Sequence, residues 1–180
     1  MPTIQDFSSL STEELVQAFS ISLDKPPLSR LRAALGSWPE VLRVLTLVID
    51  FDTEVSMNGI LGFLENSTGQ WFGETIEAFD LIGATETAGI LRRVHEAMNR
   101  HGMTPATLRS EVNGAPLYDV VSFDELHGAK NKDMSLEVVQ IADDLYLYAD
   151  SAGSQEDPWQ LLFYYVGPRR QQLLDALSQT

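Results

Sequence analysis

The 180-residue chain has no cysteine, few basic residues and no long apolar run, and each absence excludes a class of protein. Without cysteine it has no disulfide, no thiolate catalysis and no cysteine-based zinc site, which fits a reducing cytoplasm. The most apolar stretches, 41–51 and 161–166, are too short to span a bilayer. Residues 1–10 lack a basic region followed by an apolar run, so no signal peptide is predicted. These absences predict a cytoplasmic protein that does not enter a membrane.

The scarcity of basic residues leaves the chain strongly acidic. There are 26 acidic residues against 12 basic ones, which gives a formal net charge of -14. Residues 50–150 carry 18 of the acids and six of the bases, whereas 1–49 and 151–180 are nearly neutral. Such a chain is repelled by nucleic acid and by anionic membranes and is attracted to basic partners. The uneven distribution favours an acidic surface region over the alternative, in which charge serves only solubility.

Apolar residues recur at helical spacing along most of the chain. This pattern predicts an all-α protein, with residues 1–180 forming a single irregular helical bundle. The alternative is a mainly α fold with a small β hairpin near the C-terminus, which would pair 145–148 with 161–166. Residues 135–150 are predicted to form a helix with Leu136, Val139, Leu145 and Tyr148 on its inner face, although the alternation in residues 145–148 also permits a strand.

Proline, glycine and polar residues predict where several helices begin and end. Pro39 fits the first turn of a buried helix, which reaches a bend or a helix join at Asn58-Gly59. A second helix runs from about Trp71 and stops at Gly83. Thr85 is expected to cap the helix that follows.

The residue types that carry catalysis do not form a constellation in this sequence. The helix motif of zinc proteases begins at His95, but Asn99 replaces the second histidine that the motif needs. Asp50, Asp52 and Glu54 are close enough in sequence to form a cation site, although such runs more often face water. The sequence therefore predicts no catalytic residue, no metal and no cofactor.

Three acids share one side of the helix that starts near Trp71. Glu74, Glu77 and Asp80 follow at i, i+3 and i+6, with neighbours about 5–6 Å apart, and we call them the acidic stripe. Like charges so placed weaken a helix, which suggests that the stripe is used for binding. In the alternative, the dipeptide Arg92-Arg93 neutralises it. The candidate residues for binding a partner are the acidic stripe and Glu65.

One segment, EVSMNGILGFLENSTGQWFGETIEAFDLIGA over residues 54–84, resembles the signature of the acidic DNA-mimic protein family. That family is a helical domain widespread in bacteria, and its usual run is Glu-Val-Asn-Asn-Gly-Gly-Phe, Gln-Phe-Phe, Asn-Ser-Ser-Gly, Glu-Thr-Ile-Glu-Ala-Leu and Ile-Gly-Ala. This chain departs from it within 56–60, where Gly59 alone matches, and at Gly62. Weaker likeness on both sides extends the family-like core to about 38–101. The matching residues are Glu54, Val55, Gly59, Phe63, Asn66, Ser67, Gly69, Glu74, Thr75, Ile76, Glu77, Ala78, Ile82, Gly83 and Ala84.

The matching motif contains residues that suggest structural roles. Asn66 and Gly69 fit turn and capping positions, and Gly59 fits a position of close packing. Glu54 and Gly83 complete the predicted structural motif. None of these five residues implies catalysis.

The resemblance implies a function. The characterised branch of the family is a dimer whose surface carboxylates imitate duplex phosphates and capture a DNA-binding transcription factor. For this chain the resemblance implies a non-enzymatic acidic protein-binding module, a DNA mimic and a homodimer, with a basic DNA-binding protein as partner. Two alternatives stay open: an interaction or immunity-type protein whose partner does not bind DNA, and an enzyme with a carboxylate-bound metal.

Overall fold

The computed structural model of the chain describes residues 7–113, 131–145 and 156–179. These residues form an all-α fold, as predicted, and none of them lies in a β-strand. The elements in chain order, with η for a 3-10 helix, are α2 (Thr12–Ser22), η1 (Leu28–Ser37), α3 (Glu40–Glu65), η2 (Ser67–Trp71), α4 (Phe72–Ile82), α5 (Thr85–Arg100), α6 (Pro105–Asn113), α8 (Lys132–Ala142), α9 (Pro158–Val166), η4 (Gly167–Arg169) and α10 (Arg170–Leu177).

The alternative fold with a C-terminal hairpin is wrong. Residues 161–166, which would form one of its strands, belong to α9. Residues 146–148 of the other strand lie outside the described residues. Pro158 at the first turn of α9 and the Asp157 side chain, which accepts a hydrogen bond from the Gln160 N–H at 3.0 Å, set a helix start that outweighs the tendency of this apolar run to form a strand.

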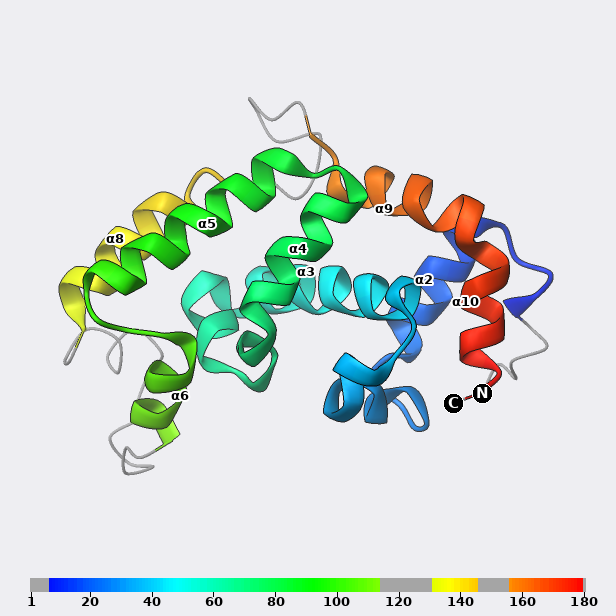
Figure 1. The fold of residues 1–180 in the computed structure, drawn as a ribbon, viewed down its shortest axis with the longest axis horizontal. Coiled ribbons are helices and arrows are strands. Elements are labelled where there is room, and N and C mark those ends of the chain that lie inside the picture. Colours follow the sequence, from blue (N-terminus) through cyan, green and yellow to red (C-terminus); the bar gives the residue numbers. More distant parts are fainter. Residues whose placement is uncertain (1–6, 114–130, 146–155, 180) are drawn as a thin grey trace.

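Helix α3 is the central element, and the other helices pack around it (Figure 1). α4 crosses α3, α5 packs on both α4 and α8, and α6 contacts α3 and η2. At the other end of the molecule, α2, α9 and α10 each contact α3. The first half of α3 is buried on nearly all sides from Val41 to Asp52, as expected of a helix that runs through a core.

An aromatic cluster fixes α4 on α3. The rings of Phe51 and Phe63, both on α3, meet edge to face with 4.9 Å between their centroids. Phe79 of α4 meets Phe51 in the same geometry at 5.2 Å. Edge-to-face pairs contribute about 0.5–1.5 kcal/mol beyond the area that they bury. This packing holds the apolar side of α4 inward and so sets which side of α4 faces solvent.

The predicted bend of α3 lies at Gly59, where φ is 68° and ψ is -178°. Essentially only glycine adopts this conformation. The predicted close packing of Gly59 is wrong, because a Cβ built there would meet nothing within 4 Å. Close packing is found instead at Gly69, where a Cβ would lie 2.5 Å from the Phe63 carbonyl oxygen and 2.6 Å from that of Leu64. The glycine of the turn, and not that of the bend, permits the close contact with α3.

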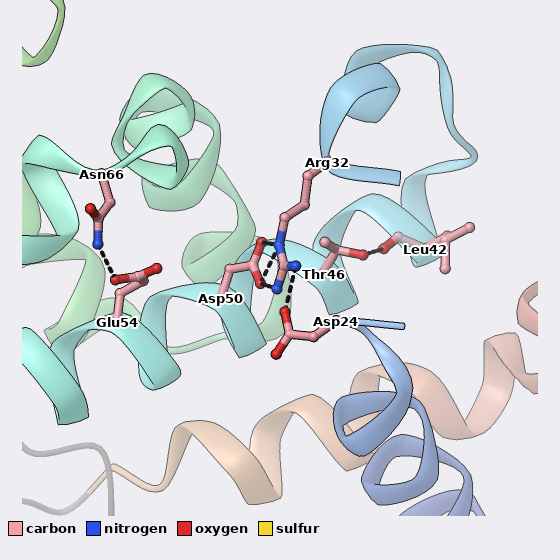
Figure 2. Close-up of polar contacts among 7 residues, drawn as sticks. All are labelled: Asp24, Arg32, Leu42, Thr46, Asp50, Glu54 and Asn66. Carbon is pink, nitrogen blue, oxygen red and sulfur yellow. Dashed lines mark hydrogen bonds and ion pairs between the residues drawn. The ribbon is translucent and has the colours of Figure 1, made fainter. Parts of the chain in front are cut away.

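A hydrogen bond joins the two sides of the α3 bend. Asn66 Nδ2 donates to Glu54 Oε2 at 2.6 Å, as Figure 2 shows, and Asn58 Nδ2 donates to the same oxygen at 3.2 Å. Asn66 is also the C-cap of α3, as predicted, and its backbone N–H donates to the Gly62 carbonyl at 3.0 Å. The matching motif therefore encodes a bent helix that a carboxylate–amide contact holds together.

The turn between α4 and α5 is partly as predicted. Gly83 ends α4 in a left-handed conformation with φ of 89°. Thr85 does not cap α5, because the N-cap position is Ala84. The cap comes from the Glu156 carboxylate, which accepts from the backbone N–H groups of residues 86–87 at 3.0 and 2.9 Å. A contact between groups 70 positions apart leaves no signal in local sequence.

The helix predicted over 135–150 is found as α8, which begins earlier and ends at Ala142, and its expected inner face is wrong for two residues. Leu136 and Val139 are 60% and 41% exposed, whereas Met134 and Val138 are buried. Leu145, after the helix end, is half-buried, and Tyr148 lies outside the described residues. Both sides of α8 carry apolar residues at helical spacing, so periodicity alone does not select the inner one. The packing of α8 against α5 and α3 determines which of its sides is buried.

Candidate functional site: the outer face of helix α4

Helix α4 has a buried apolar side and an acidic side that faces outward. Phe72 and Phe79, seven residues apart, point into the core. The acidic stripe lies away from them: Glu77 and Asp80 are exposed and Glu74 is half-buried. The aromatic packing beneath α4 therefore holds these carboxylates at the surface.

The arginines of α5 neutralise only part of the acidic stripe. Arg92 forms an ion pair with Asp80. Glu74 and Glu77 form no ion pair with any residue in the described part of the chain. Neutralisation by an arginine therefore applies to Asp80. The carboxylates of Glu74 and Glu77 are free, as the binding interpretation of the stripe requires.

All three arginines of α5 contact acids from neighbouring segments. Besides the Arg92 pair, Arg93 lies 2.9 Å from Asp144, which follows α8, and Arg100 pairs with Glu137 of α8. The three arginine side chains are 49% to 56% exposed, so each pair contributes roughly 0–1 kcal/mol. These pairs join α5 to α4 and α8 and lower the net charge of this surface.

Glu137 has a second basic neighbour. His101, at the end of α5, places Nε2 2.8 Å from the carboxylate. Hydrogen bonds from Arg100 and then from His101 hold the pKa of Glu137 below its ordinary value. Glu137 is therefore ionised at neutral pH and links α8 to the C-terminal end of α5.

The prediction that Glu65 binds a partner at the surface is wrong. Glu65 is 7% exposed, because the whole last turn of α3, residues 62–65, is buried. Both α6 and η2 pack against α3, so the end of this helix lies under other elements.

Asp50 of α3 is used inside the molecule. It is 6% exposed and accepts hydrogen bonds from Arg32 Nε at 2.9 Å and from Arg32 Nη2 at 2.5 Å. Arg32 Nη1 also donates to Asp24 at 2.6 Å, so one guanidinium joins α3 to the end of α2 (Figure 2). Burial raises the pKa of the Asp50 carboxyl and Arg32 opposes that rise, while the hydrogen bond from Arg32 to Asp50 raises the pKa of Arg32.

The interpretation of residues 50–54 as a solvated face is therefore wrong for two of its members. Asp50 and Asp52 are both buried, and Glu54 is half-buried and bonded to Asn66. A cation site is not formed either, since no group of three His, Asp or Glu side chains is placed to hold a metal ion within the ranges that the structure describes.

On α5, on α8 and directly after α8, four further acids are exposed and have no ion pair with a described residue, and the sequence alone did not propose them for binding. Of these elements, α5 packs beside α4. Helical periodicity is the signal that could have found the three that lie in helices, because each occupies a polar position of an amphipathic pattern, whereas Asp143 follows the end of α8. These acids are Glu86, Glu96, Asp133 and Asp143.

The remaining candidate sites are accounted for by structural contacts. A shallow pocket between the α4–α5 turn and the start of α9 is lined by Glu156 and Asp157, which cap α5 and α9. The His95 ring packs edge to face on Phe72, with 5.8 Å between centroids. None of the helices in the described residues is both long enough and apolar enough to cross a membrane. The absence of a metal and of a cofactor stays a prediction.

Comparison with known families identifies the fold. The model of the family described as DMP19-like protein matches residues 36–166, which include the 54–84 segment and run from the last turn of η1 to the end of α9. No curated protein and no solved structure matches the chain. DMP19 is a DNA-mimic family and is not a known family of enzymes. The match covers most of the chain and confirms the resemblance to acidic DNA mimics, so the chain belongs to the DMP19-like protein family.

Proposed function

We propose that this protein is a non-enzymatic DNA mimic that occupies the basic surface of a DNA-binding protein such as a transcription factor. Membership of a DNA-mimic family is the observation that carries the proposal. The formal net charge of -14 supports it, because such a chain is repelled by nucleic acid and attracted to proteins that bind nucleic acid.

Helix α4 supplies the centre of the proposed surface. Glu74 and Glu77 lie about 4.5 Å apart along the helix axis, at about 1.5 Å of rise per residue. One strand of duplex DNA offers a phosphate about every 3.4 Å. A basic groove that evolved to follow phosphates thus meets carboxylates at a similar spacing. Because neither glutamate has an ion pair within the described chain, a partner's cation reaches them without displacing another.

The ion pairs of α5 enlarge this surface. Asp80, Asp144 and Glu137 are bound to arginines that are about half-exposed. A surface ion pair contributes little, so a partner's arginine exchanges with one of them at small cost. The proposed surface therefore consists of the acidic stripe, the four further free acids and these exchangeable carboxylates.

The proposed mechanism is electrostatic. The acidic surface covers the basic surface of the DNA-binding protein, and the DNA site that this protein would occupy stays free. Binding between exposed charges weakens as salt screens them. The homodimer that the family resemblance implies is a separate prediction, which light scattering of the purified chain tests.

Affinity capture from the native cell lysate tests the proposal. The protein is immobilised, bound proteins are eluted with stepped salt, and they are identified by mass. We expect basic DNA-binding proteins to elute at moderate salt and to lose their DNA when the purified protein is added. A neutral partner that resists high salt would overturn the proposal in favour of an interaction protein of another kind.

A charge-matched pair of variants tests the location of the surface. Glu74→Lys with Glu77→Lys reverses the free part of the stripe. Glu13→Lys with Asp175→Lys, at exposed positions on α2 and α10, changes the net charge equally. We expect capture to be lost with the first variant and kept with the second. Equal loss with both would show that total charge, and not α4, determines binding.

A further inference from the structure

The bend of α3 exposes an asparagine that precedes a glycine. Residues 56–59 are all exposed, and Met57 shows 75% of its surface to solvent. Asn58 is the last residue before the bend, because Gly59 leaves helical geometry with φ of 68° and ψ of -178°. Nothing would lie within 4 Å of a Cβ at Gly59, so the Asn58–Gly59 peptide is also open on its glycine side.

From this geometry we propose that Asn58 is a site of spontaneous deamidation. The backbone nitrogen of Gly59 attacks Cγ of the Asn58 side chain, a C–N bond forms, and the side-chain amide leaves as ammonia. The product is a five-membered succinimide, which water opens at either carbonyl to give aspartate or isoaspartate. Solvent supplies the water, and no oxidant or reductant takes part. Asparagine is among the thermolabile residues, and a following glycine places no side chain in the way of the attack.

The contacts of Asn58 leave its side chain easy to release. Its Nδ2 donates to Glu54 Oε2 at 3.2 Å, whereas Asn66 donates to the same oxygen at 2.6 Å. Glu54 is therefore held mainly by Asn66, and rotation of the Asn58 amide toward Gly59 loses only the longer bond. Both residues of the reacting peptide, Asn58 and Gly59, are exposed, so water reaches the succinimide.

Two other asparagines with described side chains, Asn66 and Asn99, lack this combination. Asn66 is half-buried, donates to Glu54 and precedes a serine. Asn99 is exposed but precedes Arg100, whose side chain stands in the way of the attack, and the residue after it keeps helical geometry. Asn99 is thus a control for exposure without a bend and without a following glycine.

Conversion of Asn58 alters the bend chemically. Aspartate at this position adds one negative charge four residues after Glu54, and like charges at that spacing repel. Isoaspartate also routes the backbone through the side-chain carbon and lengthens α3 by one atom where it turns. Both products lose the amide that donates to Glu54, so the aged protein is more acidic and its bend is less restrained.

Peptide mapping of the aged protein tests the proposal. The folded chain is incubated at neutral and mildly alkaline pH, digested, and analysed by mass, with isoaspartate detected by enzymatic methylation. We expect the converted fraction at Asn58 to exceed that at Asn99 severalfold and to rise with pH. Asn58→Gln keeps an amide donor and abolishes the signal in that peptide.

A denatured sample keeps the test falsifiable. In denaturant the intrinsic reactivity of the Asn58-Gly59 pair is measured without the influence of the fold. If Asn58 reacts there but converts no faster than Asn99 in the folded chain, the bend protects the asparagine and the proposal is overturned. The readout requires no binding partner, so it is independent of the DNA-mimic function.

Discussion

The carboxylates of α3 and those of α4 belong to the same acidic stretch of sequence but have opposite environments. On α3, Asp50 is buried against Arg32, and Glu54 bonds to Asn66 across the bend. On α4, Glu74 and Glu77 face outward and have no ion pair among the described residues. Net charge counts all of these acids alike, although only the second group is available to a partner.

The difference arises from what lies beneath each helix. α3 runs through the core, so a charge on its inner side is tolerated only when a partner group meets it. Phe72 and Phe79 anchor one side of α4 in the core, so core packing does not restrict the residues on its other side. An acid on α3 is therefore expected to stabilise the fold, and an acid on the outer face of α4 to serve binding.

Substitution of Asp50 gives the largest expected effect. Asp50→Ala leaves the Arg32 guanidinium, which is 29% exposed, without its main acceptor. Removal of one partner of a largely buried pair costs about 3 kcal/mol, which lowers the Tm by roughly 6–12 °C in a chain of this size. Urea and thermal unfolding measure the change. Adding Arg32→Ala to Asp50→Ala should restore part of the lost stability. If Asp50→Ala alone were as stable as the parent, the acids of α3 would not differ from those of α4 in their contribution to stability.

Glu54 tests the bend. Glu54→Ala removes the acceptor of two side-chain hydrogen bonds, from Asn66 and Asn58, and should cost about 1.5 kcal/mol. Glu54→Gln keeps one oxygen for Asn66 and should cost clearly less. Denaturant unfolding separates the two variants. Glu13→Ala, at an exposed acid of α2, is the control and should stay within about 0.5 kcal/mol of the parent.

The expected effect of substituting Glu137 is intermediate, because its carboxylate joins α8 to α5 at the surface. Contacts with Arg100 and His101 lower its pKa in the folded state, so its stabilising contribution is complete above the ordinary value of about 4.3. That contribution is lost as pH falls through the lowered folded-state pKa. The Tm of Glu137→Gln should therefore lie below that of the parent at neutral pH and meet it in acid. A constant gap at all pH values would show that ionisation is not responsible.

The local sequence was sufficient for most helix boundaries. The bend at Asn58-Gly59 and the stop at Gly83 depend on residues that act within one or two turns, and both were predicted. The cap of α5 was not, because Glu156 comes from 70 residues away. The inner side of α8 was not either, since its neighbours and not its periodicity decide between two apolar sides.

The candidate surface was predictable only in part. Helical spacing put the acidic stripe on one side of α4, but the sequence did not distinguish Glu65, which is buried in the last turn of α3, from the exposed acids. The pairing of Asp80 with Arg92 was one of two alternatives that sequence left open. Spacing within one helix gives the direction of a side chain, whereas burial and pairing depend on elements distant in sequence.

The substitution with the smallest expected effect, Glu77→Gln, should stabilise the fold instead of destabilising it. It is therefore the sharpest test of the contrast between the acids of α3 and those of α4. Glu77 has acidic neighbours three residues away on both sides, Glu74 and Asp80, and like charges at this spacing destabilise a helix by about 0.2–0.5 kcal/mol per pair. Because glutamine and glutamate have similar helix propensities, Glu77→Gln should raise the free energy of unfolding by a few tenths of a kcal/mol while it weakens capture of a basic partner. Paired urea titrations resolve a difference of this size when both proteins are measured side by side. A loss of about 1 kcal/mol or more would mean that Glu77 holds the fold as Asp50 does. A small gain in stability, together with weaker binding, would identify Glu77 as a residue kept for its charge.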